Sequence, residues 1–182
     1  MKIVVLKFGG TSVGTIEKIK KVTDIIIEHK KKKNKVIVVS SAMSGVTNDL
    51  IKKSKQISNN FIDSEYDVLV SSGEQVACSL IAGRLNHKGF KSRSWLGWQI
   101  PIFTNGPYTN SRIQQVNKNK LLRFLKEGGI PIITGFQGVN MNERVTTIGR
   151  GGSDASAIMI AKFFKAQRLS LIHISEPTRR TP

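Results

Sequence analysis

Short, uninterrupted apolar runs recur along the chain, and each predicts a buried strand. Lys2–Lys7 (KIVVLK), Lys35–Val39 (KVIVV) and Ile130–Thr134 (IPIIT) are the clearest of these runs. Continuous apolar runs of this length are typical of parallel strands that are covered on both faces. Weaker strand candidates are Lys91–Trp95, Gln99–Phe103 and Val145–Ile148.

Between these runs the apolar residues recur every three or four positions, which predicts helices. Thr15–Lys32 has this spacing, with Glu17 in its first turn and lysines at its end, as the helix dipole favours. The alternation predicts an α/β fold with a mainly parallel sheet, whose ligands bind beyond the carboxyl ends of the strands. Further predicted helices are Asn48–Ser58, Asp67–Asn86, Val116–Glu127 and Gly152–Phe164.

The composition is that of a folded protein. Of 182 residues, 39% are hydrophobic, 1 is cysteine and 3 are histidine, which excludes a disulfide scaffold and argues against a Cys/His zinc cluster. We expect no metal ligand among the side chains. No run of about 18 apolar residues is present to span a membrane, and the apolar N-terminal stretch is too short for a secretory signal. We therefore expect a cytoplasmic protein that engages no membrane.

The chain carries 29 Lys and Arg against 12 Asp and Glu, a formal net charge of +17. Such a balance is typical of nucleic-acid-binding proteins. However, the basic residues are scattered over predicted helix faces, apart from Lys30–Lys33 with Lys35. We expect no nucleic-acid partner, and a lysine-rich composition or a missing acidic part of a longer protein explains the charge. A basic nucleic-acid-binding module is the alternative hypothesis.

The end of the chain differs from the rest. Helical periodicity stops after Lys165, and Leu169–Arg179 (LSLIHISEPTR) matches the in-frame translation of a common transposase-type sequencing adapter. We therefore expect residues 169–182 to be a non-native, adapter-like tail and residues 1–168 to be a truncated domain. A natural disordered tail is the alternative.

The first constellation with chemical potential follows the first strand. Lys7 precedes Gly9, Gly10 and then Ser12, just before a helix. Glycines let backbone N–H groups approach a phosphate, and the start of a helix favours an anion. Lys7 would supply charge to a transferring phosphoryl group, although the spacing is not that of a Walker A loop. A tight turn that requires glycine is the alternative interpretation.

Two further constellations suit a small polar substrate. Ser40–Asp49 concentrates hydroxyl groups around Gly45, more densely than helix capping by Thr47 and Asn48 requires. Glu74 interrupts an apolar helix and would receive an ammonium group, unless it is an ordinary exposed carboxylate.

The fourth constellation, Thr146–Asp154 (TTIGRGGSD), precedes the last predicted helix. Three glycines surround Arg150, whose guanidinium offers a fork for a carboxylate or a phosphate. Ser153 and Asp154 lie at the start of the helix. A flexible linker would not normally carry a lone Arg and Asp in this arrangement, so we interpret the segment as an anion-binding turn.

Together these stretches resemble the signature set of one family. KFGGTSV (Lys7–Val13), VSSAMSGVTN (Val39–Asn48), SSGE (Ser71–Glu74) and TTIGRGGSD are similar to the motifs of the aspartate kinases, in the amino-acid kinase superfamily. The resemblance covers residues 1–168 and implies a three-layer α/β/α sandwich, truncated here. Acetylglutamate, glutamate 5- and uridylate kinases share a Gly-Gly loop, but the second and fourth motifs argue against each of them.

The resemblance also implies a reaction, in which MgATP phosphorylates the β-carboxylate of L-aspartate on the route to lysine, threonine and methionine. It implies that Lys7 neutralises the transferring phosphoryl group, that Glu74 takes the α-ammonium of aspartate and that Arg150 takes its α-carboxylate. Asp154 would hold Lys7 or order the loop. The other implied contacts are Gly9, Gly10 and Ser12 on the phosphoryl path, Ser41, Ala42 and Thr47 beside aspartate, and Ser153 closing the pocket.

Members of this family continue past the equivalent of Arg168 into a strand and loop that grip the nucleotide, and then into regulatory ACT domains. The resemblance therefore implies that residues 1–168 are the substrate-binding part of a kinase domain, with ATP and Mg²⁺ as cofactors. It implies a homodimer or higher oligomer for the full-length protein. We expect the chain alone to be inactive and to leave an open, apolar sheet edge.

Overall fold

The computed structural model describes residues 2–149 and 151–174. Its centre is a five-stranded sheet in which every neighbouring pair of strands is parallel. The three long apolar runs form its three middle strands, as expected for strands covered on both faces. In spatial order the strands are β3 (Ser92–Trp95), β6 (Ile130–Thr134), β2 (Lys35–Ser40), β1 (Ile3–Phe8) and β9 (Arg168–Ile172).

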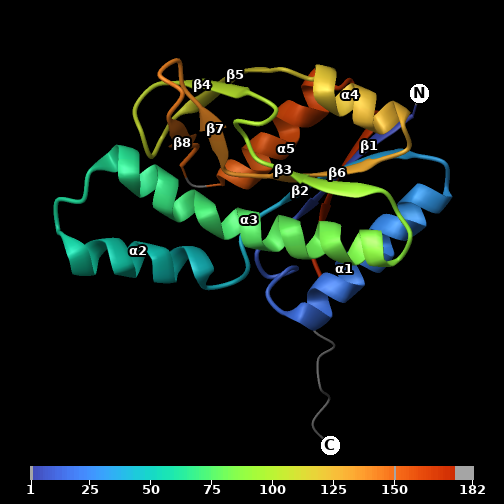
Figure 1. Ribbon diagram of the computed structural model, residues 1–182, viewed down its shortest axis with the longest axis horizontal. Helices are drawn as coiled ribbons and strands as arrows, with labels where there is room; N and C mark the ends of the chain where they lie inside the picture. Colours follow the sequence, from blue (N-terminus) through green and yellow to red (C-terminus); the bar gives the residue numbers. More distant parts are fainter. Residues whose placement is uncertain (1, 150, 175–182) are drawn as a thin grey trace, which may run out of the picture.

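Helices cover both faces of this sheet, which confirms the three-layer α/β/α sandwich (Figure 1). Alternate residues of β1 face opposite layers. Val4 and Leu6 pack toward α1 (Ile16–Lys31) and α3 (Asp63–His87). Ile3 and Val5 pack toward α4 (Asn119–Lys126) and α5 (Gly152–Phe163). The helix α2 (Val46–Ile57) runs beside α3. No helix in the described ranges is long and apolar enough to cross a membrane.

A second, smaller sheet lies above the N-terminal half of α3 in Figure 1. Its order is β5 (Arg112–Val116), β4 (Ile102–Asn105), β7 (Gln137–Val139) and β8 (Val145–Thr147), with β4–β5 and β7–β8 antiparallel. Only β4 and β8 were predicted. The helix predicted from Val116 begins at Asn119 instead, because Val116 pairs with Ile102 at the end of β5.

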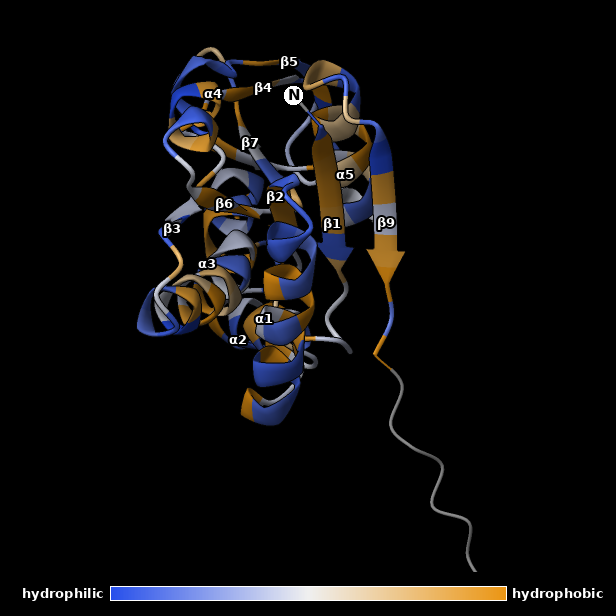
Figure 2. Ribbon diagram, turned by 90° about the vertical axis from the view of Figure 1, so that its right-hand side faces the viewer, coloured by the Kyte–Doolittle hydropathy of each residue, from blue (hydrophilic) through white to orange (hydrophobic). Residues whose placement is uncertain are grey.

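Strand β9 was not predicted. It pairs with β1 from Val4–Arg168 to Phe8–Ile172, and Leu169 packs against the apolar core (Figure 2). The described sheet therefore ends at β9 rather than at β1, and the expected open edge lies along β9. Pairing needs only backbone groups and a few apolar side chains, which this stretch supplies. The adapter origin of residues 169–182 stays a prediction, and its last eight residues, 175–182, lie outside the described range.

Two lysines of the basic cluster serve the fold. Lys30 Nζ donates to the Gly128 carbonyl at 2.7 Å, and Lys35 Nζ donates to the Leu125 carbonyl at 2.9 Å. Both carbonyls lie at the C-terminal end of α4, where the helix dipole favours a cation. This local function of the cluster weakens the nucleic-acid hypothesis.

Candidate active site

A cavity of about 690 Å³ opens beyond the carboxyl ends of β1 and β2. This is the position at which an open parallel sheet binds its ligands. All four constellations contribute to its wall. The predicted residues that line it are Lys7, Gly10, Ser41, Ala42, Thr47, Glu74, Ser153 and Asp154. The wall also includes Tyr66, Thr109, Phe136 and Thr147, to which the sequence had assigned no role.

Lys7 and Asp154 form an ion pair in this wall. Lys7 Nζ lies 2.6 Å from Asp154 Oδ1, and the lysine side chain is only 10% exposed. Asp154 stands in the first turn of α5, where the helix dipole stabilises a carboxylate. The partner carboxylate compensates the cost of burying the ammonium, which is thereby held at a fixed place beside the cavity.

The loops that follow β1 and β2 touch through their backbones. A Cβ on Gly10 would lie 2.9 Å from the Ala42 carbonyl oxygen, closer than real Cβ atoms come. A Cβ on Gly73 of α3 would lie 2.9 Å from Ala42 Cβ. Ala42 is therefore held between two glycines. Packing alone requires glycine at position 10, so the motif is a structural turn whatever else it binds.

Glu74 is buried in the middle of α3, with 3% of its surface exposed, so the interpretation as an ordinary exposed carboxylate is wrong. Its Oε1 accepts a hydrogen bond from the Ala42 N–H at 3.2 Å, and its Oε2 is buried with no hydrogen-bond partner among the described residues. Burial raises the pKa of Glu74 to about 7. A buried carboxylate with one free oxygen beside a cavity suits a cationic ligand group.

A second buried carboxylate, Asp67, lies two turns before Glu74 on α3. It is fully buried, and both of its oxygens are hydrogen bonded. Oδ1 accepts from the Thr147 hydroxyl at 2.6 Å, Oδ2 accepts from the Thr147 N–H at 2.8 Å, and the Thr109 N–H lies 3.0 Å from each oxygen. The sequence reasoning missed this residue. Its one signal was a spacing of seven positions from Glu74, which places both on one helix face.

The turn before α5 packs on the end of β6. A Cβ on Gly135 would lie 2.7 Å from Ser153 Oγ. The Ser156 hydroxyl accepts from the Phe136 N–H at 3.1 Å and donates to the Gly152 carbonyl at 2.8 Å. These contacts hold the first turn of α5 in the cavity wall, where the positive end of the helix dipole favours an anion.

Other predicted residues lie elsewhere. Ser12 is fully buried and does not line the cavity, because its hydroxyl donates to the Ile172 carbonyl and accepts from the Ile174 N–H, both at 3.0 Å. Gly9 is not in the cavity wall, although a Cβ there would lie 3.4 Å from Lys7 Nζ. Arg150 lies outside the described residues.

The capping alternative for Thr47 and Asn48 is wrong. The helix α2 starts at Val46 after Gly45 as N-cap, and no side chain caps it. Thr47 therefore lies inside the first turn, with its residue in the cavity wall.

The remaining reactive groups add no site. In residues 2–149 and 151–174, no group of three or more His, Cys, Asp or Glu side chains could hold a metal ion. Cys78 is fully buried in the core, and burial raises the pKa of its thiol, which disfavours the nucleophilic thiolate.

Comparison with known proteins places these features in a family. Residues 2–173 match the amino acid kinase family. The aspartokinase of Geobacillus stearothermophilus is 46% identical over 171 residues, which cover 94% of this chain and 42% of that protein. The chain thus spans less than half the length of the curated relatives it matches.

Solved structures agree in fold. Aspartokinase III of E. coli, in complex with aspartate and ADP, superposes with a TM-score of 0.82 at 25% identity, covering 93% of this chain and 48% of that one. The aspartate kinase of Synechocystis gives a TM-score of 0.79 at 36% identity, covering 92% of this chain and 28% of that one.

Proposed function

Because this chain belongs to the amino acid kinase family, we propose that it carries the aspartate-binding part of an aspartate kinase. Such an enzyme transfers a phosphoryl group from MgATP to the β-carboxylate of L-aspartate. The similarity to aspartokinases over 94% of the chain supports this proposal. The observation that carries it is the buried Glu74 oxygen without a described partner, in the same cavity as the ammonium of Lys7.

Each charge of aspartate has a complementary group in this proposal. Glu74 Oε2 receives the α-ammonium, and Arg150 takes the α-carboxylate, as the family resemblance implies. Ser41, Ala42 and Thr47 border the substrate, and Ser153 closes the pocket. Thr47 and Ser153 bring hydroxyl groups to the cavity wall, and the N-terminal turn of α5 favours a carboxylate nearby.

No side chain needs to act as a nucleophile. A β-carboxylate oxygen of aspartate is already ionised and forms the new bond to phosphorus, while the bond to the ADP oxygen breaks. Lys7 neutralises charge on the transferring group, Asp154 holds Lys7, and Gly9 and Gly10 line the path of the phosphoryl group, as the family resemblance implies. The rate then depends on positioning. The family resemblance also places Ser12 on the phosphoryl path. Its N–H donates to the Gly9 carbonyl, and its hydroxyl is bonded to Ile172 and Ile174, which belong to the predicted non-native tail.

The described residues bear on how Mg²⁺ and the nucleoside of ATP would be held. No group of three or more His, Cys, Asp or Glu side chains in the described ranges could hold a metal ion. Mg²⁺ needs only one or two carboxylates besides the phosphates, and the absence of a protein ligand for it stays a prediction. By family resemblance the nucleoside pocket would be formed by a segment after Arg168. We therefore propose that the 182-residue chain binds aspartate with little or no turnover, and that the full-length protein is a cytoplasmic homo-oligomer.

Isothermal titration of L-aspartate into the chain tests the proposal. We expect saturable binding to the unaltered chain and a loss of about 100-fold in affinity in Glu74→Gln, because the ammonium loses its charged partner. Glu28→Gln, at an exposed position on α1, is the matched control and should bind normally. Equal affinity in Glu74→Gln and the unaltered chain would refute the assignment.

A further inference from the structure

We propose that Asp67 is a positioning residue that sets the length of the aspartate pocket, and with it the preference for L-aspartate over L-glutamate. This inference rests on the proposed function, because it takes Glu74 as the ammonium site. Asp67 itself does not line the cavity; it acts through Thr109 and Thr147, which do.

Asp67 joins three separate parts of the chain. Its two oxygens accept from the Thr147 hydroxyl and N–H and from the Thr109 N–H, at distances between 2.6 and 3.0 Å. Thr147 ends β8, and Thr109 lies in the loop before β5. One side chain of α3 thus holds two segments of the cavity wall that neither belong to α3 nor pair with the central sheet.

The two segments are also bound to each other. The Ser111 N–H donates to the Thr147 carbonyl at 2.9 Å, and the Ser111 hydroxyl donates to the Pro107 carbonyl at 2.8 Å. A Cβ on Gly149 would lie 2.9 Å from Asn110 Oδ1, so the loop also packs on the turn after β8. Any outward movement of this wall must break the bonds of Asp67 or carry the whole loop along.

Asp67 and Glu74 lie seven residues apart on α3, roughly 10 Å along the axis at about 1.5 Å per residue, so one rigid helix holds both. In the proposed function Glu74 receives the α-ammonium, and the wall that Asp67 holds leads into Gly149, beside the Arg150 that takes the α-carboxylate. Together they fix the α-carbon of the ligand. The side-chain carboxylate must then reach toward Lys7 over a set distance, and the extra methylene of L-glutamate does not fit that distance. Rejection of one extra methylene by a rigid pocket is worth about 10- to 200-fold.

Titrations of L-aspartate and L-glutamate into Asp67→Asn test the inference. The amide NH₂ of asparagine cannot accept the hydrogen bonds from Thr147 and Thr109 that a carboxylate oxygen accepts. The cavity wall formed by these two residues would therefore no longer be fixed to α3. We expect aspartate affinity to fall about tenfold while glutamate affinity changes less than about threefold, so that the selectivity ratio narrows. A purely structural role would lower the melting temperature and leave this ratio unchanged in the folded fraction.

A matched pair of variants covers the case in which Asp67→Asn does not fold. Thr147→Val deletes the 2.6 Å bond to Asp67, whereas Thr146→Val deletes a bond of the same length, between Thr146 and Thr104 within the small sheet. Only Thr147→Val should narrow the ratio of L-aspartate affinity to L-glutamate affinity. Equal narrowing in both variants, or none in Thr147→Val and Asp67→Asn, overturns the role of Asp67. Failure of the unaltered chain to bind aspartate overturns the proposed function instead, and the role of Asp67 with it.

Discussion

The inner face of α3 holds two buried carboxylates whose surroundings are opposite. Around Asp67, donors from Thr109 and Thr147 satisfy both oxygens. Around Glu74, a single N–H satisfies one oxygen, and no described residue satisfies the other. Buried polar groups normally find partners, so an unsatisfied one needs an explanation. The fold explains Asp67, and the proposed function explains Glu74 as the site of the α-ammonium.

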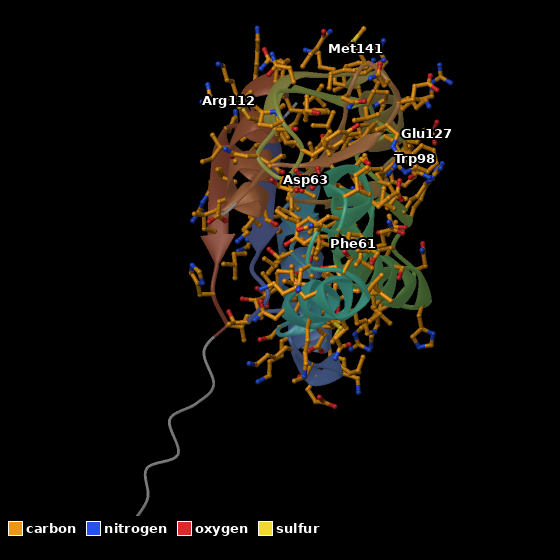
Figure 3. The ribbon with its side chains drawn as sticks, turned by 90° about the vertical axis from the view of Figure 1, so that its left-hand side faces the viewer. Phe61, Asp63, Trp98, Arg112, Glu127 and Met141 are labelled. Atoms are coloured by element: carbon orange, nitrogen blue, oxygen red, sulfur yellow. The ribbon has the colours of Figure 1, made fainter. Side chains whose placement is uncertain are left out.

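The volume of a cavity does not distinguish a ligand site from an ordinary groove in this molecule. A groove of about 820 Å³ between β3 and α4 is larger than the candidate site, and Trp98 and Glu127 mark its side of the molecule in Figure 3. Two of its charged side chains already have partners within the protein: Arg93 stacks 4.1 Å over Trp95, and Glu127 pairs with Lys91 at 2.6 Å. Trp95 Nε1 has no described partner, but a neutral indole costs less to bury unpaired than a carboxylate oxygen does.

The largest expected effect comes from removing the satisfied carboxylate. Asp67→Ala leaves the buried N–H and hydroxyl of Thr147 and the partly buried N–H of Thr109 without their acceptor. Each buried group left unpaired costs about 1–3 kcal/mol. We expect the free energy of unfolding to fall by about 3 kcal/mol or more in urea titration. Asp63→Ala, at the start of the same helix, is the control. A loss below about 1 kcal/mol would mean that Asp67 is not holding the wall.

Removing the unsatisfied carboxylate of Glu74 should raise the free energy of unfolding instead of lowering it. The pKa of Glu74 is about 7 in the folded chain, above its ordinary 4.5, so the folded state binds the extra proton. Stability from this group is present below pH 4.5 and is lost as pH rises through 7. Glu74→Gln should therefore be more stable than the unaltered chain at pH 8, by about 3 kcal/mol, and nearly equal to it at pH 4.5. Urea titrations at both pH values measure this difference; a destabilised variant at pH 8 contradicts it.

This pair of carboxylates also shows how far sequence reasoning reaches. Lys7 was found because it is a charged residue at the end of an apolar run, beside a glycine-rich motif. Glu74 stood out as a charged residue within an apolar helix, but only the family resemblance gave it a role. Asp67 was not found, because the partners that define it lie 42 and 80 positions away in the chain. The fold was predictable to the same extent, where the signal is local. Continuous apolar runs identified the three middle strands of the central sheet, whereas β7 has three residues and no periodic pattern of apolar positions.

A smaller effect is expected on ligand binding as a function of pH. Only ionised Glu74 attracts an ammonium, and the pKa of the free site is about 7. Aspartate affinity should be flat above that value and should fall by up to tenfold per unit below it. Between pH 8 and pH 6 we expect about a tenfold loss by isothermal titration, accompanied by proton release on binding. Affinity that improves on acidification would exclude Glu74 as the ammonium site.

The smallest expected effect tests whether the two carboxylates are independent. A Cβ on Gly73 would lie 2.9 Å from Ala42 Cβ and 3.1 Å from Val46 Cγ1, so Gly73→Ala must push away the loop whose N–H binds Glu74. Alanine gains about 1 kcal/mol in helix propensity, and overpacking costs about 1–3 kcal/mol, which leaves a net loss of about 1 kcal/mol. Gly83→Ala is the matched control, because no described atom lies within 4 Å of the added Cβ. It gains the same helix propensity without overpacking and should stabilise the chain. If the regions are separate, Gly73→Ala weakens aspartate binding and leaves the aspartate-to-glutamate ratio intact, since the bonds of Asp67 are untouched. A change in that ratio would mean that α3 transmits strain between the surroundings of Glu74 and those of Asp67. The effects of the two carboxylates on binding could then not be interpreted separately.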